Sequence, residues 1–370
     1  MKILYVITST DIGGAEKALA DLAIETSKAH QVKILCLKKL GSVSEELKQQ
    51  GIEVISLGMK WYSQRNITKK IAEVIENFQP DLVHAMLYRA IEYTRIAIAG
   101  KGIKLLTTPH FDLSKKNVFL RYTDRMLKDL DTLTVAESFS TAKYLVEKQR
   151  YDKNKVFLLP NGVDKHLFFQ DKSIRMDMRK KNGYSSDNVI FISVARLEPV
   201  KDPLTLLQSF RNVYRLCPQA RLVYVGEGKE RNKIEEYIKQ SNLQEAVLLV
   251  GRQKNISDWL NMADIFMLTS VEESLPLSLL EALYVGLPCI VTNVGDMPLW
   301  VENGKNGFVC KKRDITLFSC FMNELVLDSA KRRKMSEYSL KLSQRIVNNF
   351  QQYQQIYQQL FENSFHVKTN

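Results

Sequence analysis

Two glutamates in the segment SVEESLPLSLLEALYVGLPCIVTNVG carry the strongest chemical signal in the chain. Glu273 and Glu281 have seven residues between them, and Ser274–Leu277 begins a helix for which Pro276 suits the first turn. Glu281 lies inside this helix between apolar neighbours, where a carboxylate without a partner is unfavourable to bury. A hydroxyl-rich ligand such as a ribose would satisfy it, and the free amides at the helix start suit phosphate or sugar oxygens. A surface glutamate on an amphipathic helix is the alternative.

Two cations follow a predicted strand in the segment SVARLEPVKDP. Arg196 and Lys201 come directly after the first strand of the second half of the chain. Ligands of open α/β sheets bind outside the carboxyl ends of the strands. A guanidinium and an ammonium at that edge are suited to hold a diphosphate. The alternative is that Arg196 and Lys201 are two solvated surface charges without a ligand.

Glycines mark two further turns at predicted strand ends. Gly13 and Gly14 stand between the first strand and the first helix, where they allow close approach of a ligand and leave helix amides free for anions. Gly226 and Gly228 follow a strand of the second half. Neither pair forms the G-x-G-x-x-G fingerprint of dinucleotide-binding proteins, so a dehydrogenase is disfavoured. A plain strand-to-helix turn is the alternative for Gly13 and Gly14, and Gly226 and Gly228 make a tight turn at the same sheet edge as Arg196 and Lys201.

Short β-branched runs alternate with helical patterns along the whole chain, which predicts parallel sheets covered by helices. The pattern restarts at Val189–Val194, and the polar stretch Asn161–Asp187 is the predicted boundary between two α/β domains. The predicted strands are Ile3–Ile7, Val32–Leu37, Glu53–Leu57, Leu82–His84, Lys104–Thr107, Thr132–Val135, Val156–Leu159, Val189–Val194, Arg221–Val225, Val247–Val250, Ile265–Leu268 and Cys289–Thr292. Aromatic and aliphatic residues recur at helical spacing from Phe350 to Phe361, so a terminal helix needs a surface to cover.

The composition excludes wholesale disorder, because 45% of the 370 residues are hydrophobic and 25% are charged. The formal net charge of +12 suits an anionic partner, but no basic tail typical of nucleic-acid arms is present. The five cysteines show no CxxC spacing and are interpreted as reduced thiols rather than metal ligands. No apolar run is long enough to span a membrane, so we expect a cytoplasmic protein, with peripheral membrane contact as an open alternative.

One segment of the first domain, LSKKNVFLRYTDRMLKDL, combines basic and apolar residues at helical spacing. One interpretation is contact with anionic lipid headgroups and a lipid-linked substrate, and the other is an ordinary solvated helix face. Its candidate contact residues are Lys115, Lys116, Phe119, Arg121, Arg125 and Lys128.

An ordered set of short motifs resembles the GT-B glycosyltransferases and, within them, glycosyltransferase family 4. The set runs through nearly the whole chain: GGAE, Pro109-His110, NGVD, ARLEPVKDP, VGEG, Gly251-Arg252, ADIFMLTS, the Glu273/Glu281 motif and GKNGF. The resemblance implies two Rossmann-like domains facing across a cleft, with doubly wound parallel sheets. It implies an acceptor-binding domain at 1–165, a donor-binding domain at 166–347 and a C-terminal helix, about 348–370, that crosses back to the first domain.

The same resemblance implies a role for each motif residue. Arg196 and Lys201 would hold the donor diphosphate and stabilise the departing nucleotide, Glu281 would bind the ribose, and Glu273 would meet hydroxyls of the transferred sugar. His110 would position that sugar, and the loop Gly251–Ile256 would receive the base. The implied donor-binding residues are Gly14, Gly226, Arg252, Ser274, Leu275, Pro276, Leu277 and Glu281. Ser274 and Leu275 depart from the glycine and aromatic residue frequent in the family, which leaves the identity of the sugar open.

The implied activity is a retaining, metal-independent hexosyltransferase that uses a nucleotide sugar and no cofactor. UDP-sugars lead and GDP-sugars follow as donors, and the acceptor is a glycan or lipid-linked glycan of cell-envelope polysaccharide or lipopolysaccharide synthesis. Two alternatives keep the fold: a sugar-nucleotide-binding protein without activity, and a nucleotide-sugar epimerase. The intact set Arg196, Lys201, Glu273 and Glu281 argues against the first.

Overall fold

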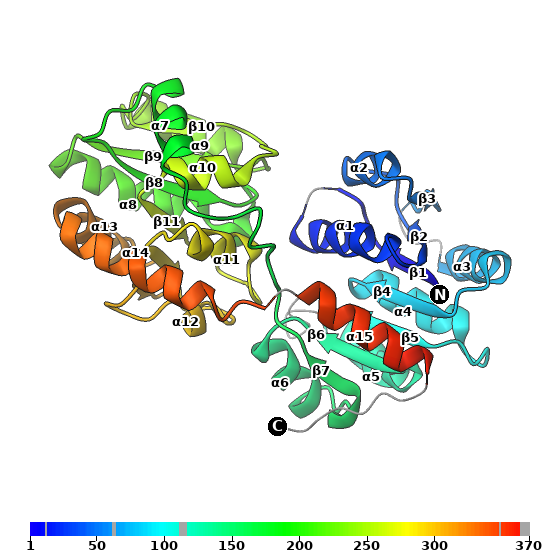
Figure 1. Ribbon diagram of the computed structural model, residues 1–370. Helices are drawn as coiled ribbons and strands as arrows, with labels where there is room; N and C mark the ends of the chain where they lie inside the picture. Colours follow the sequence, from blue (N-terminus) through cyan, green and yellow to red (C-terminus); the bar gives the residue numbers. More distant parts are fainter. Residues whose placement is uncertain (12, 61–63, 111–116, 348, 363–370) are drawn as a thin grey trace. The chain divides into compact units, whose positions relative to one another are not determined.

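The computed structural model describes residues 1–11, 13–60, 64–110, 117–347 and 349–362. The chain forms two compact units, of which one comprises Met1–Asn161 with Asn349–Asn370 and the other comprises Gly162–Asn348. Each unit contains one parallel sheet with helices on both of its faces (Figure 1). The predicted α/β class is therefore confirmed.

The N-terminal unit contains a seven-stranded parallel sheet in the order β3-β2-β1-β4-β5-β6-β7. Its strands are β1 (Lys2–Ile7), β2 (Gln31–Cys36), β3 (Glu53–Ser56), β4 (Leu82–Met86), β5 (Leu105–Thr108), β6 (Leu133–Ala136) and β7 (Val156–Leu158). Successive residues of β1 enter different cores, because side chains of a strand alternate between the two faces of its sheet. Ile3 and Tyr5 belong to one core, whereas Leu4 and Val6 belong to the other. A strand buried on both faces reads as the continuous apolar run seen in the sequence.

Helices of the N-terminal unit cover both faces of this sheet. They are α1 (Gly14–Ser27), α2 (Val43–Gln49), α3 (Gln64–Phe78), α4 (Tyr88–Ile98), α5 (Val118–Leu127), α6 (Phe139–Glu147) and α15 (Asn349–Phe361). Residues of α1, α2 and α15 join the core of Ile3 and Tyr5, and residues of α3 and α4 join the core of Leu4 and Val6.

The C-terminal helix α15 forms part of the same compact unit as residues Met1–Asn161. The hydroxyl of Tyr357 lies 3.0 Å from the hydroxyl of Tyr5 and 2.9 Å from Nδ1 of His84. Lys104 Nζ donates to the carbonyl oxygen of Leu360 at 2.6 Å. A buried polar cluster therefore fixes the helix to β1, β4 and β5 in addition to its apolar face.

The C-terminal unit contains a six-stranded parallel sheet in the order β10-β9-β8-β11-β12-β13. Its strands are β8 (Val189–Val194), β9 (Ala220–Val225), β10 (Val247–Leu249), β11 (Ile265–Leu268), β12 (Cys289–Thr292) and β13 (Gly307–Cys310). Strand β13 was not among the predicted strands, because a run of three apolar residues after a glycine is too short to indicate a strand. A Cβ at Gly307 would lie 1.8 Å from the carbonyl oxygen of Cys289, so only glycine permits this pairing.

The helices of the C-terminal unit also lie on both faces of the sheet. They are α7 (Lys172–Lys181), α8 (Pro203–Leu216), α9 (Arg231–Gln240), α10 (Ile256–Met262), α11 (Leu277–Tyr284), α12 (Met297–Trp300), α13 (Ile315–Leu327) and α14 (Ser329–Ser343). The polar stretch proposed as a boundary contains α7, whose Arg175 and Arg179 each bind the carboxylate of Asp264 at 2.6 Å. These arginines anchor α7 to the C-terminal unit.

Two predictions about the chain as a whole can be compared with the structure. All five cysteines are free thiols, four of them buried and Cys320 exposed, as expected. Of the helices that the structure describes, none has the length and apolar character needed to cross a bilayer.

Candidate functional site

The topology of the C-terminal sheet places a crevice between two of its strands. The chain leaves β8 toward β9 and β10 on one side, and it leaves β11 toward β12 and β13 on the other. The loops that follow β8 and β11 therefore diverge, and ligands of doubly wound sheets bind at this switch point outside the carboxyl ends of the strands. Arg196 and Lys201 follow β8, and Glu273 follows β11. Chain topology alone therefore brings the three residues to one edge.

An ion pair joins the two loops at the switch point. Lys201 Nζ lies 2.5 Å from Glu273 Oε1, and the hydroxyl of Ser270 donates to the same carboxylate oxygen at 2.7 Å. The side chains of Lys201 and Glu273 are 19% and 9% exposed, so the pair is largely shielded from solvent. A charge-assisted hydrogen bond with little access to water fixes both groups before any ligand binds.

Backbone contacts hold the same two loops together. The amide of Val271 donates to the carbonyl oxygen of Val200 at 2.9 Å. The hydroxyl of Thr269 donates to the carbonyl oxygen of Asp202 at 2.8 Å. Asp202 has a φ of 46°, a left-handed conformation that is uncommon outside glycine, and α8 begins at the next residue. The position of Lys201 is thus determined by the backbone as well as by its ion pair.

The start of α11 lies next to this pair and differs from the prediction in one detail. Pro276 occupies the N-cap position with a φ of −72° and a ψ of 130°, rather than the first turn of the helix. Pro276 has no side-chain hydrogen-bond acceptor with which to cap the helix start. Amides at a helix start are suited to donate to phosphate or sugar oxygens.

A glycine that the sequence marked only as part of a motif supports the loop before α11. A Cβ at Gly295 would lie 2.3 Å from the carbonyl oxygens of Glu273 and Ser274, and the φ of Gly295 is +53°. The neighbouring amide of Asp296 donates to the carbonyl oxygen of Ser274 at 2.8 Å. Sequence spacing could not identify this role, because Gly295 follows a different strand, β12.

The other predicted residues of the α11 segment are buried to different degrees. Glu281 is buried in α11, as its apolar neighbours led us to expect. Leu275 is buried in the adjoining apolar core, whereas Ser274, Pro276 and Leu277 are partly exposed.

Two arginines at the same sheet edge have side chains available to a ligand. Arg196, after β8, and Arg252, after β10, are exposed, and neither forms an ion pair or hydrogen bond with its side chain in the part of the chain that the structure describes. Gly226 packs between their loops: a Cβ there would lie 2.0 Å from the carbonyl oxygen of Ala195, and its amide donates to Gly251 at 2.8 Å. The structure thus brings the loops of both arginines into contact with one glycine turn.

Gly14 and His110 belong to the N-terminal unit. Gly14 is the exposed first residue of α1, directly after the N-cap residue Gly13. His110 follows β5 with a φ of 53°, and its Nε2 is buried with no hydrogen-bond partner among the described residues. Burial lowers the pKa of His110 to about 4, so its imidazole is neutral at pH 7. A neutral ring with one unsatisfied nitrogen can accept or donate one hydrogen bond.

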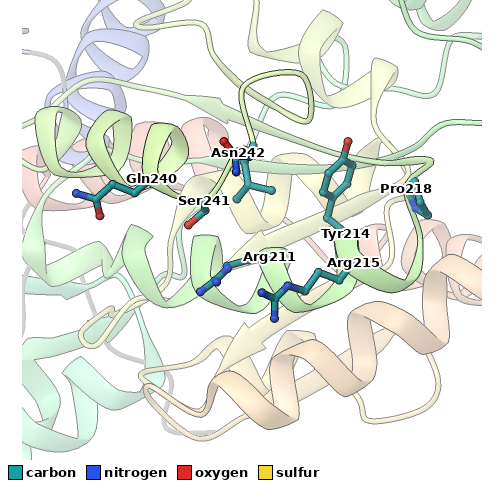
Figure 2. A pocket seen from close by; sticks show the side chains of 8 residues that line it. Arg211, Tyr214, Arg215, Pro218, Gln240, Ser241 and Asn242 are labelled. Atoms are coloured by element: carbon teal, nitrogen blue, oxygen red, sulfur yellow. The ribbon is translucent and has the colours of Figure 1, made fainter.

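The pocket in Figure 2, of about 460 Å³, is separate from the switch point. Its lining comes from the end of α8, the end of α9 and the loops that follow them: Arg211, Tyr214, Arg215, Pro218, Gln240, Ser241, Asn242 and Leu243. Both helices begin at the carboxyl edge and run back across the sheet, so the pocket lies at the opposite edge from Lys201. In the described ranges, no group of three or more His, Cys, Asp and Glu is placed to hold a metal ion.

Comparison with protein families gives two matches that follow one another along the chain. Residues 12–167 match the family described as Glycosyltransferase Family 4, and residues 175–342 match the family described as Glycosyl transferases group 1. Together the matches cover most of both units and include every predicted site residue, but they leave out β1 and α15.

Individual proteins are similar over most of the chain or part of it. N-acetyl-alpha-D-glucosaminyl L-malate synthase of Bacillus anthracis is 28% identical over 79% of this chain and 78% of its own length. UDP-Gal:alpha-D-GlcNAc-diphosphoundecaprenol alpha-1,3-galactosyltransferase of Escherichia coli is 34% identical over 50% of this chain and 48% of its own. The crystal structure of Anabaena Alr3699/HepE with UDP and glucose has a TM-score of 0.84 at 21% identity, covering 97% and 99% of the two chains. The structural likeness confirms the predicted GT-B fold.

Proposed function

The chain belongs to the GT-B glycosyltransferases of the family 4 type, and from this premise we propose that it is a retaining hexosyltransferase. The proposed reaction moves a sugar from a nucleotide sugar to a glycan or lipid-linked glycan, without a metal ion or other cofactor. UDP-sugars are the favoured donors and GDP-sugars come next. The proposed setting is cell-envelope polysaccharide or lipopolysaccharide synthesis at the inner face of the cytoplasmic membrane.

The observation that carries the proposal is the Lys201–Glu273 pair at the switch point of the C-terminal sheet. We infer that a diphosphate would lie at this sheet edge, held by the ammonium of Lys201, the exposed guanidinium of Arg196 and the first amides of α11. Glu273 is positioned by two donors, which leaves its other carboxylate oxygen to accept from a sugar hydroxyl.

The proposed mechanism follows from where charge develops during transfer. The sugar ring gains positive charge while the departing diphosphate gains negative charge, and Lys201 with Arg196 would oppose the second change. Removing one such donor typically lowers the rate by about 10²–10³. The donor phosphate would take the acceptor proton on the same face of the sugar, which is the step that retains configuration. His110 would orient the sugar through its unsatisfied nitrogen and not act as a nucleophile.

The names of similar proteins support the choice of donor and acceptor. The E. coli relative is named for UDP-Gal and a diphosphoundecaprenol acceptor, and the Anabaena structure was solved with UDP and glucose. We infer UDP recognition by the Gly251–Ile256 loop, whose Arg252 is exposed at the sheet edge. Ser274 and Leu275 stand where the family often has a glycine and an aromatic residue, so the transferred sugar is to be identified by experiment.

Calorimetric titration with UDP, GDP and ADP, followed by transfer assays with the sugars of the base that binds, tests the proposal. Lys201→Ala is expected to lower transfer by at least about 100-fold while the circular dichroism spectrum stays unchanged. Lys180→Ala is the matched control, because Lys180 is exposed on α7 of the same unit, away from the loops that follow β8 and β11. Full activity of Lys201→Ala would reject the assigned role. Donor converted to an epimer or to free sugar without an acceptor would instead favour an epimerase or a hydrolase.

A further inference from the structure

Helix α5 of the N-terminal unit turns its large apolar side chains toward solvent. Four of its ten residues are apolar or aromatic and strongly exposed: Val118 is 71% exposed, Phe119 70%, Tyr122 59% and Met126 65%. Phe119, Tyr122 and Met126 recur at steps of three and four residues, so they share one side of the helix. Soluble proteins scatter exposed apolar residues singly, and a group on one helix indicates an interaction surface.

The side of α5 that faces the protein holds Leu120 and Leu127, which are partly buried, together with polar residues. Its one buried residue is Asp124, whose Oδ1 accepts from Arg95 Nη1 at 2.8 Å and from the Tyr151 hydroxyl at 2.9 Å. The hydroxyl of Tyr88 donates to the carbonyl oxygen of Leu120 at 2.9 Å. Polar contacts therefore hold the protein-facing side of α5, while its most exposed apolar side chains face outward, unlike those of an ordinary amphipathic helix on a protein surface.

This orientation is locked by a buried charge network. The guanidinium of Arg95 also binds Asp131, with Nε at 2.7 Å and Nη2 at 2.6 Å from its two carboxylate oxygens. Rotating α5 to bury Phe119 and Met126 would withdraw Asp124 and expose the helix side that Arg95 now holds. Removing one partner of a buried ion pair is strongly unfavourable. The apolar side of α5 therefore stays outside in the isolated protein.

The exposed charge on α5 is positive. Its exposed or partly exposed charged residues are Arg121 and Arg125, and its single acidic residue, Asp124, is buried. Arg125 donates to the carbonyl oxygen of Lys148, which brings a further exposed lysine beside the helix. Lys128, just beyond the helix, is balanced by Asp129 at 2.8 Å. Lys115 and Lys116, predicted as part of this surface, lie outside the described residues.

We propose that α5 docks the N-terminal unit onto an anionic lipid bilayer. Val118, Phe119, Tyr122 and Met126 enter the headgroup region, and Arg121 and Arg125 meet lipid phosphates. An apolar helix side flanked by arginines, without an exposed acidic residue on the helix, has the composition of interfacial helices. The inference deepens the proposed function, because a bilayer surface is where a lipid-linked acceptor would be presented. A single ten-residue helix gives weak, salt-sensitive and reversible binding.

Flotation of the full-length protein with vesicles tests this docking. Vesicles contain phosphatidylcholine either alone or with phosphatidylglycerol, and the protein is expected to float mainly with the anionic ones. Phe119→Ser combined with Met126→Ser should lower the bound-to-free ratio at least tenfold, and Arg125→Glu severalfold at low salt. Met176→Ser and Lys180→Glu are matched controls, because both residues are exposed on α7 of the C-terminal unit. The controls should float like the wild type.

Each contrary result has one meaning. Equal flotation of the wild type and the Phe119/Met126 variant overturns the proposal. The proposal is also overturned if the wild-type protein does not float with vesicles but sediments as a dimer, and the variant sediments as a monomer. The surface would then serve self-association. UDP titration of the same variants should give unchanged affinity. Wild-type protein that floats through α5 but binds no nucleotide would overturn the proposed function and leave the docking standing.

Discussion

Acidification should destabilise the N-terminal unit through His84. This side chain is fully buried in β4, where Nδ1 lies 2.9 Å from the Tyr357 hydroxyl and Nε2 lies 2.8 Å from the Thr108 hydroxyl. Desolvation, aided by the nearby His110, lowers the pKa of His84 to about 3. An unfolded histidine has a pKa of about 6.5, so the unfolded chain binds a proton over a range in which the folded one does not.

The sign and size of the effect follow from this difference. A histidine whose folded pKa is depressed stabilises the fold fully above pH 6.5, and this contribution is lost as the pH falls toward 3. Each pH unit below 6.5 lowers the free energy of unfolding by about 1.4 kcal/mol, so His84 accounts for about 2 kcal/mol between pH 7 and pH 5. That is a large part of the stability of an ordinary domain.

Urea titrations at pH 7, 6 and 5 measure this loss. Hydrogen exchange of peptides from β4 and α15, corrected for the intrinsic exchange rate, reports the N-terminal unit separately, because two units need not unfold together. His84→Gln should be less stable at pH 7 but should lose about 2 kcal/mol less between pH 7 and pH 5. His166→Gln is the control, since His166 is exposed in the C-terminal unit. Equal pH slopes for the wild type and His84→Gln would refute the reasoning.

Three further substitutions test other parts of the structure. Gly295→Ala should abolish UDP binding measured by calorimetry, because its Cβ would clash with two carbonyl oxygens, whereas Gly304→Ala, with open space around it, should bind normally; equal binding would contradict the packing. Arg95→Met leaves two buried carboxylates without their cation and should lower the free energy of unfolding in urea by about 3–5 kcal/mol. Tyr357→Phe removes the hydroxyl shared with His84 and should cost about 1–2 kcal/mol in the same titration; an unchanged midpoint would show that α15 does not depend on it.

The fold was largely predictable because its strands and helices produce local patterns of apolar residues in the sequence. Parallel strands buried on both faces appear as continuous apolar runs, and the helices between them carry the period of an α-helix. Strand β13 was not predicted, because the three apolar residues after Gly307 are too short a run. Pro276 was predicted in the first turn of the helix but is its N-cap residue, one position earlier. A helix boundary depends on backbone hydrogen bonds that the sequence does not display.

The candidate site was predictable in its residue types and less so in its contacts. Arg196 and Lys201 were identified because they follow a strand end, and Glu273 was identified from its spacing to Glu281. The strand order then brings the loops of all three residues to one edge. The partner of Lys201 was not predicted, because Glu273 lies 72 positions away. The support from Gly295 was missed for the same reason, since its close contacts are made with a loop from another strand.

The sequence by itself determined the order of elements, the family and the chemistry of the residues at the strand ends, because these properties depend on neighbours along the chain. The tertiary structure alone decided which charged groups pair and which helix sides face outward. Helical spacing identified α5 as amphipathic, yet Asp124 is its one buried residue, whereas Phe119 and Met126 are exposed. The reason is the buried Arg95, which binds Asp124 from another helix and makes burial of a carboxylate more favourable than burial of Phe119.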